Sequence, residues 1–328
     1  MTDLPKDLGP DDTGITPGVS VVLPTYNRAD LVTRAVESVL SQTYHPIDLI
    51  IVVDGSMDDT MRRLEPYRGR ARIVQQTNAG LGAARNAGIA LARGRYIAFL
   101  DDDDFWHPDK IRLQVEFFQA HRTCSMVCAA TAAISSPDQP MDAILALRNA
   151  DGIIDRPLLK KVQGGLLIVP SSIMYDRVRV PDARFYAVRG CMEDVAFIVD
   201  VLAAGEFGVA GDRPLVFYSV GTARSLAADA NFWILGAYHM RRELRAGRLG
   251  PSTGTGAKDT REIVAFIART AAVTSINAGR YSDGMKIYLQ EFWPQLRLGR
   301  GRFLLGFPPL LLKVLMTRSR PAPAAGRP

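Results

Sequence analysis

Apolar runs alternate with segments of helical apolar spacing along the first 130 residues. The continuous runs predict buried strands at 19–24, 48–54, 71–76 and 95–100. Apolar residues three and four positions apart predict helices at 29–42, 58–67, 81–93 and 108–121. We expect Gly94 to end the third of these helices and Pro108 to lie in the first turn of the fourth. Strands and helices in alternation predict an α/β fold, with a mostly parallel sheet covered by helices on both faces.

The second half of the chain is less regular and becomes helical toward its end. Strand patterns occur at 124–134, 164–175 (with a bend at Pro170), 207–211 and 214–220, and a helical pattern at 192–205. From Asp229 onward three long helical patterns follow, with a glycine-rich polar loop at 248–258. The predicted organisation is a flexible leader over 1–18, a domain over 19–220 with halves at 19–110 and 111–220, and a helical extension over 221–328.

The composition argues against a membrane-spanning protein and against a secreted, disulfide-bonded one. No stretch supplies the 18 or more apolar residues of a spanning helix, and the N-terminus lacks the basic and apolar regions of a signal peptide. Three cysteines do not make a disulfide framework, so we expect a cytoplasmic protein.

The basic charge is concentrated at the C-terminus. Residues 297–328 hold seven of the basic residues and no acidic one, interleaved with leucines and other apolar residues, while the rest of the chain is close to neutral. This mixture suits an anionic membrane surface at the inner face of the cell membrane, whereas a nucleic-acid partner is not expected. The alternative is a helix or strand packed on the body and followed by a disordered end. Pro308 and Pro309 are expected to interrupt any helix there.

Four consecutive aspartates, Asp101 to Asp104, follow the predicted strand at 95–100. At an effective dielectric constant near 20, two unit charges 4 Å apart repel each other by about 4 kcal/mol. The four carboxylates must therefore be separated by solvent or neutralised by positive charge. The first case is an acidic turn exposed to water, and the second is a divalent metal site. Polar clusters also follow the first two strands, and in a parallel sheet these strand ends meet at one edge, where ligands bind.

Several stretches together resemble the family 2 glycosyltransferases, which are inverting enzymes with the GT-A fold. The resemblance is carried by "VSVVLPTYNRADLVTRAVESVLSQTY", "IIVVDGSMDDT", "QTNAGLGAARNAGIALARGRYIAFLDDDD", "HPDK" and the later "EDVAF". Most of these lie within residues 19–110. The resemblance implies transfer of a sugar from a nucleotide-sugar donor to an acceptor hydroxyl. The polymerising members' Gln-x-x-Arg-Trp element is not evident, which favours transfer of a single sugar.

The resemblance also assigns the donor side of the site. It implies Mn²⁺ or Mg²⁺ held by Asp103 and Asp101, and hard carboxylate oxygens suit either ion. The implied donor-binding residues are Pro24, Tyr26, Asp54, Arg85, Asp101 and Asp102. Asp54 matches the acid that accepts a hydrogen bond from uracil, which favours a UDP-sugar. However, Val53 stands where many members have another aspartate, and this departure weakens the assignment of the base.

The resemblance implies that Asp194 is the catalytic base and that Glu193 orients it or contacts the acceptor. Simpler interpretations exist for each residue: Tyr26 in the core, Asp54 capping a turn, Arg85 as a surface cation, and the acid pair as ordinary residues of a helix first turn. His107 is expected to cap a helix or lie at the surface, or to reach a metal. The expected acceptor is a glycan or a lipid-linked sugar in surface polysaccharide biosynthesis. The alternatives are a catalytically silent nucleotide-sugar-binding protein and a sugar nucleotidyltransferase.

Overall fold

The computed structural model describes residues 16–134, 146–147, 152–155, 157, 168–186, 192–220, 229–251 and 253–318. The chain forms two compact units, one of residues 1–189 and 193–225 and the other of residues 190–192 and 226–328. The predicted leader falls mostly outside the described residues, and its last positions, 16–18, already belong to the first strand.

The first unit is built on a sheet to which the described residues contribute eight strands. Their order is β3 (Arg72–Gln76), β2 (Ile47–Asp54), β1 (Thr16–Thr25), β4 (Gly94–Phe99), β10 (Ile173–Asp176), β6 (Cys124–Ala129), β11 (Glu206–Ala210) and β9 (Gly152–Ile153). The pairs β3/β2, β2/β1, β1/β4 and β6/β11 are parallel, whereas β10 is antiparallel to both its neighbours and β9 is antiparallel to β11. The predicted mostly parallel sheet is confirmed.

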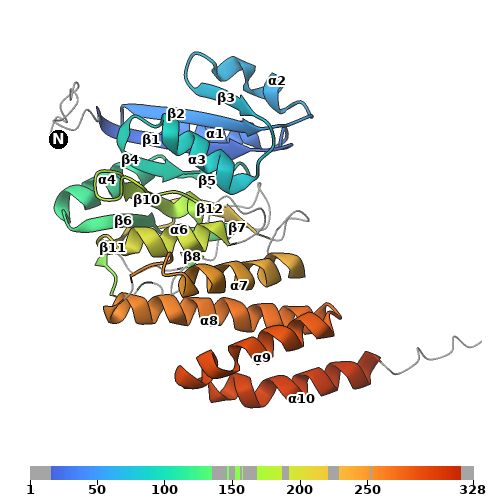
Figure 1. Ribbon diagram of the computed structural model, residues 1–328. Helices are drawn as coiled ribbons and strands as arrows, with labels where there is room; N and C mark the ends of the chain where they lie inside the picture. The colour runs from blue at the N-terminus through green and yellow to red at the C-terminus, as the bar shows by residue number, and fades with distance from the viewer. Residues whose placement is uncertain are drawn as a thin grey trace, which may run out of the picture. The chain divides into compact units, whose positions relative to one another are not determined.

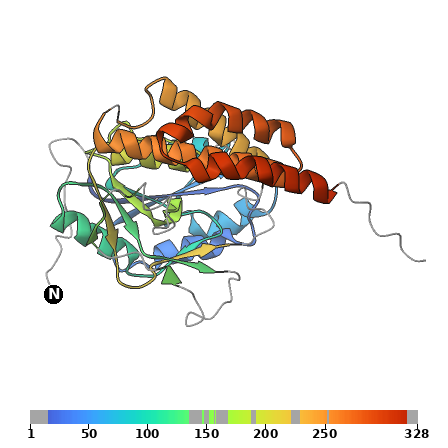
Figure 2. The ribbon, with the colours of Figure 1, turned by 90° about the horizontal axis from the view of Figure 1, so that it is seen from below.

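Helices cover both faces of this sheet because its strands are apolar on both sides (Figures 1 and 2). One face carries α1 (Val32–Leu40) and α4 (Lys110–Ala120), whose side chains share a core with the strand residues Val21, Ile51 and Ala98. The other face carries α3 (Leu81–Leu91) and α6 (Glu193–Leu202). Between β2 and β3 lie the short helix α2 (Thr60–Leu64) and a 3₁₀ turn over Glu65–Tyr67.

A second sheet, with four strands among the residues that the structure describes, lies within the same unit. Its order is β5 (Phe105–Trp106), β12 (Val216–Ser219), β7 (Thr131–Ile134) and β8 (Ala146–Leu147). The predicted strand over 124–134 is therefore two strands, β6 and β7, which pass from one sheet to the other at Ala130. Of the predicted strand at 164–175, residues 164–167 lie outside the described residues. The 3₁₀ turn at Pro170–Ser172 and β10 form the rest.

The second unit is helical, as predicted for the C-terminal extension. It contains α7 (Ala230–Arg245), α8 (Gly254–Asn277), α9 (Tyr281–Arg297) and α10 (Gly301–Arg318), each packed against the next (Figure 1). Helix α8 begins four residues earlier than its apolar pattern indicated, so part of the expected loop at 248–258 is helical. Among the described helices none combines the length and hydropathy needed to cross a bilayer.

Two predicted helix boundaries are wrong. Helix α3 ends at Leu91, and Gly94 instead begins β4, where a Cβ would lie only 2.6 Å from the backbone nitrogen of Ser20. Glycine is thus needed there for close strand contact rather than as a helix cap. Pro108 precedes α4, whose N-cap is Asp109.

Helix α10 continues through Pro308 and Pro309, contrary to the expected interruption. Both prolines are exposed, so their rings point to solvent. Proline at 308 leaves the carbonyl of Leu304 without its helical donor. The hydroxyl of Tyr288 donates a hydrogen bond to that carbonyl over 2.9 Å, which replaces the missing backbone interaction.

Candidate active site

The predicted polar clusters lie at one edge of the large sheet, because β2, β1 and β4 are parallel neighbours. Pro24 is near the end of β1 and Tyr26 follows it, Asp54 is the last residue of β2, and Asp101 follows β4. Tyr26 is 44% exposed, so its placement in the core is wrong. Its exposed ring is available to contact a ligand at this edge.

Three arginines accompany the aspartate run. Arg85 donates to a carboxylate oxygen of Asp101 over 2.6 Å. Arg28 lies 3.9 Å from Asp102 and 3.7 Å from Asp103, close enough to pair with both but too far for good hydrogen bonds. Arg34 donates to the backbone carbonyl of Asp103 over 3.0 Å. Positive side chains of the protein therefore supply part of the charge that the four acids require.

The acids nevertheless remain short of positive charge. Burial raises the pKa of Asp102 to about 7, and the charges of Asp103 and Asp101 add to this, while Arg28 opposes it. Burial and the neighbouring Asp101 also raise the pKa of Asp103. A further cation at this position would stabilise the ionised carboxylates.

Asp104 does not face solvent, contrary to an exposed acidic turn. Its side chain is buried and accepts hydrogen bonds from the Ser171 hydroxyl (2.5 Å) and the Ser219 amide (2.9 Å). Burial, and then the charges of Asp101 and Asp103, raise its pKa well above the usual range. Asp104 thus fixes the aspartate run to the turn before β10 and to the end of β12.

Arg85 connects the aspartate run with the predicted catalytic acids. Its guanidinium lies 2.6 Å from Asp101 and 3.8 Å from Glu193, and stacks 4.9 Å from the Phe185 ring centre. The side chain is buried, so a role as a surface cation is wrong. Burial disfavours its charge, but Asp101 and Glu193 outweigh this and raise the pKa of Arg85. Asp101, Glu193 and Asp194 are thereby brought into one charged cluster.

Glu193 and Asp194 are the first residues of α6, where the helix dipole favours acidic side chains. Glu193 is buried, and burial together with the charge of Asp194 raises its pKa, while Arg85 lowers it. Asp194 is half-buried. The preceding Met192 has a φ of 41°, an uncommon conformation for a residue other than glycine, and such strain is often found beside functional residues.

Asp54 is already well bonded within the protein. It accepts hydrogen bonds from the Gln76 side chain (2.8 Å), the Ala79 amide (2.9 Å) and the Gly80 amide (2.9 Å). It therefore caps the turn that leads into α3, although not through the glycine that follows it. A carboxylate has about four acceptor sites, so these contacts leave room for one donor from a ligand.

Arg28 is a site residue that sequence reasoning missed. Its loop is joined to the loop after β2: the Asn27 side chain accepts from the Met57 amide (2.8 Å), and the Arg28 amide donates to the Thr60 hydroxyl (3.2 Å). Asn27 has a φ of 51°, which asparagine tolerates better than most residues. In the sequence, the signal for such a residue was indirect: four adjacent aspartates require a positive charge nearby.

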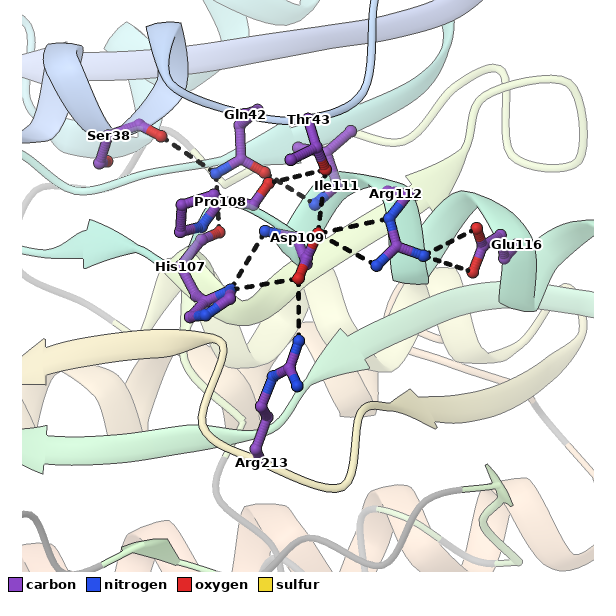
Figure 3. A network of polar contacts seen from close by, with 10 residues as sticks. All are labelled: Ser38, Gln42, Thr43, His107, Pro108, Asp109, Ile111, Arg112, Glu116 and Arg213. Carbon is purple, nitrogen blue, oxygen red and sulfur yellow. Dashed lines mark hydrogen bonds and ion pairs between the residues drawn. The ribbon is translucent and has the colours of Figure 1, made fainter. Parts of the chain in front are cut away.

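A network of polar contacts beyond the aspartate run holds the segment 107–112 in place (Figure 3). The buried amide of Gln42 donates to the His107 carbonyl (2.8 Å) and accepts from the Ile111 amide (3.0 Å), joining the end of α1 to the start of α4. Asp109 pairs with Arg213 (2.8 Å) and with Arg112 (3.0 Å). His107 accepts from the amide of Asp109, the N-cap residue of α4, over 3.1 Å, and so holds the turn before the helix.

The acids at the sheet edge fit a divalent cation only in part. Their oxygen atoms are suitable ligands, and the raised pKa of Asp102 and of Asp103 is consistent with a shortage of positive charge. Within the described ranges, however, no group of three or more metal-ligating side chains converges. An ion held by Asp101 and Asp103 would therefore need further ligands, such as the phosphate oxygens of a donor and water.

Residues 20–177, which contain the sheet edge and the aspartate run, match the model of glycosyl transferase family 2. Residues 20–177 are therefore a glycosyl transferase family 2 domain. Chondroitin synthase of Escherichia coli is 40% identical over 118 residues, covering 35% of this chain and 17% of that protein. The UDP-Glc:α-D-GlcNAc-diphosphoundecaprenol β-1,3-glucosyltransferase WfaP of Escherichia coli is 41% identical over 106 residues. The match covers 32% of this chain and 42% of WfaP. The chain spans 17% to 54% of the length of such curated relatives.

Solved structures share the fold of this chain. S. aureus TarS 1–349 in complex with UDP aligns with a TM-score of 0.60 and 18% identity, over 94% of this chain and 95% of that one. A second structure is that of the mannosyltransferase PcManGT of Pyrobaculum calidifontis, in complex with GDP-Man and Mn²⁺. It aligns with a TM-score of 0.54 and 16% identity, over 96% of this chain and 88% of that one. The family 2 domain thus has the GT-A fold, as expected from the sequence.

Proposed function

We propose that this protein transfers one sugar, with inversion, from a nucleotide-diphosphate sugar to a hydroxyl of a glycan or lipid-linked acceptor. The observation that carries the proposal is the cluster around Arg85, which holds Asp101 2.6 Å and Glu193 3.8 Å from one guanidinium. The predicted donor-binding acid Asp101 and Glu193 of the predicted catalytic pair thus lie near one guanidinium. Family membership supports the reaction class.

In the proposed reaction the carboxylate of Asp194 takes the proton of the acceptor hydroxyl as its oxygen attacks the anomeric carbon. The new bond forms from that oxygen to the anomeric carbon, the bond from this carbon to the donor phosphate breaks, and its electron pair leaves with the nucleoside diphosphate. Arg28 lies beside Asp102 and Asp103, where a diphosphate would be expected, so its charge would stabilise the leaving group. A bound Mn²⁺ or Mg²⁺ would supply further positive charge there.

A UDP-sugar is the donor that we favour. The support is Asp54, which retains one acceptor site at the sheet edge, together with TarS, whose structure contains UDP. PcManGT contains GDP-Man, so a guanine nucleotide is the competing possibility. WfaP, by its name, acts on a diphosphoundecaprenol-linked sugar, which supports a lipid-linked acceptor in surface polysaccharide biosynthesis at the inner membrane face.

Calorimetry with UDP and GDP, each with and without Mn²⁺, tests the donor and the metal. We expect UDP to bind more tightly with Mn²⁺, and Asp103→Ala to lose this increase. Asp212→Asn, an exposed acid between β11 and β12, is the matched control and should bind as the native protein does. Equal binding with and without the ion, or preference for GDP, would contradict this part of the proposal.

The catalytic role is tested separately with Asp194→Asn. We expect this variant to bind donor normally and to lose transfer by a factor of about 10² to 10⁴, the usual contribution of a general base. If the native protein binds donor but neither it nor the variant transfers sugar to any acceptor tested, a nucleotide-sugar-binding protein is the better description.

A further inference from the structure

Helices α9 and α10 each expose a stripe of apolar side chains. On α9 the stripe consists of Leu289, Trp293 and Leu296, which are 62%, 65% and 48% exposed. On α10 it consists of Leu305, Leu312 and Met316, which are 81%, 58% and 65% exposed. At 3.6 residues per turn, each set falls within about 60° around its helix. Isolated exposed leucines need no explanation, but two aligned stripes with a tryptophan do.

The two helices are held firmly by their other sides. Tyr288 of α9 stacks on Phe307 of α10, with ring centres 4.6 Å apart, and both rings are buried. Helix α8 contacts both helices. Its Arg269 donates to Gln295 of α9 (2.8 Å), and its Glu262 accepts from Arg300 (2.6 Å), the residue before α10. The exposed stripes are therefore not loose ends of the fold. They belong to helices whose opposite faces are packed.

Basic side chains flank both stripes. Lys286 and Arg297 are exposed on α9, and Arg302 and Lys313 are exposed on α10. On each helix they lie roughly 60–80° to the same side of the stripe. The only acid between residues 286 and 316 is Glu291, which is buried and paired with Arg241. Within residues 286–316 the exposed charged side chains are therefore all basic.

We propose that the α9 and α10 stripes together form a docking surface for an anionic lipid membrane. Apolar side chains beside a row of cations are the pattern of a helix that lies in the plane of the interface, and tryptophan favours that depth. A second copy of this chain fits less well, because pairing the stripes would bring like charges together. The surface extends the expected membrane-binding segment, 297–328, backward into α9. The purpose of this surface, which is to bring the enzyme to a lipid-linked acceptor, rests on the proposed function. Membrane binding itself does not depend on that function.

Vesicle flotation tests the proposal with the full chain. We expect binding to vesicles that contain phosphatidylglycerol and little binding to vesicles of phosphatidylcholine alone. Replacing one cation, as in Arg302→Gln or Lys313→Gln, should lower the partition coefficient about fivefold. Replacing one apolar side chain, as in Leu312→Ser, should lower it at least about tenfold. Leu235→Ser is the matched control and should bind as the native protein does, because Leu235 lies on α7 and is 50% exposed, close to the 58% of Leu312.

Trp293 gives a second readout that does not depend on flotation. Its fluorescence should shift to shorter wavelength on binding and be quenched by brominated lipids, and Trp293→Phe should lose this quenching. Leu312→Ser binding as strongly as the native protein would overturn the proposal. So would a dimer in sedimentation velocity that Leu312→Ser dissociates, because a second copy would then cover the stripes. Donor calorimetry on the same variants separates this outcome from failure of the proposed function.

Discussion

The buried guanidinium of Arg85 is the residue on which the candidate site depends most. It pairs with Asp101 and Glu193 and stacks on Phe185, all within the first unit. A buried charge pair contributes little over an apolar substitute for both partners, but removal of one partner leaves the other charge unpaired. Two carboxylates would be left unpaired here.

We therefore expect Arg85→Met to lower the free energy of unfolding by about 3–5 kcal/mol. Arg62→Met is the matched control, because Arg62 forms an exposed ion pair with Asp59 and should contribute at most about 1 kcal/mol. Urea unfolding of both variants measures the difference. Equal effects would mean that the Arg85 cluster is not buried as described.

Glu243, at the end of α7, gives a prediction on pH. The Arg248 side chain, through hydrogen bonds, and then Arg242 hold the pKa of Glu243 at about 2, whereas an unfolded glutamate titrates near 4.3. Between these two pKa values Glu243 binds a proton in the unfolded chain but not in the folded chain. The stability that the Glu243 carboxylate contributes is therefore present above about pH 5 and is lost as the pH falls toward 2.

We expect Glu243→Gln to be less stable than the native protein at pH 7, with the difference shrinking as the pH approaches 3. Urea unfolding at several pH values measures it. Glu65→Gln, which removes an exposed partner of Arg68, is the control and should show a much smaller change. A difference that stays constant with pH would contradict the assigned pKa.

At the level of elements, the contact of α3 with β1 depends on the absence of a side chain at Gly88. A Cβ at this position would lie 2.2 Å from a methyl carbon of Val22. Gly306 in α10 offers the opposite situation, because a Cβ there would meet nothing within 4 Å. Alanine substitutions at these two glycines therefore distinguish the effect of helix propensity on stability from the effect of packing.

We expect Gly306→Ala to stabilise the protein by up to about 1 kcal/mol, the difference in helix propensity between the two residues. Gly88→Ala should instead destabilise it by about 1–3 kcal/mol, because overpacking outweighs that gain. Val22→Ala in combination with Gly88→Ala should recover part of the loss. Thermal or urea unfolding of the three variants measures these changes, and a stabilising Gly88→Ala would show that α3 can move away from the sheet.

The sequence was most informative where local pattern determines structure. The strands β1, β2 and β4 were predicted because continuous apolar runs end in polar residues, and this also located the sheet edge. The antiparallel pairing of β10 and the division of the strands between two sheets were not predicted, because strand pairing is long-range and the run from Cys124 to Ile134 shows no break. The aspartates were noticed for their charge, but neither the burial of Asp104 nor the position of Arg28 has a local signature.

At the level of the whole molecule, the two proposed ligands belong to different units. The proposed donor site lies at the sheet edge of the first unit, and the lipid-docking surface lies on α9 and α10 of the second. Each ligand should stabilise the part that it contacts, since binding to the folded state alone adds RT ln(1 + [L]/Kd) to the stability. At a hundredfold excess over Kd this amounts to about 2.7 kcal/mol.

Hydrogen exchange measured by mass spectrometry should therefore separate the two effects in one protein. UDP with Mn²⁺ should slow exchange in the peptides that contain residues 24–30, 54–60 and 101–104, and leave those from 281–318 unchanged. Vesicles containing phosphatidylglycerol should do the reverse. Asp103→Ala should abolish only the first pattern and Leu312→Ser only the second, so each variant is the control for the other. If UDP also protected 281–318, donor binding and the docking surface would be coupled, and the separate roles assigned to the two units would be wrong.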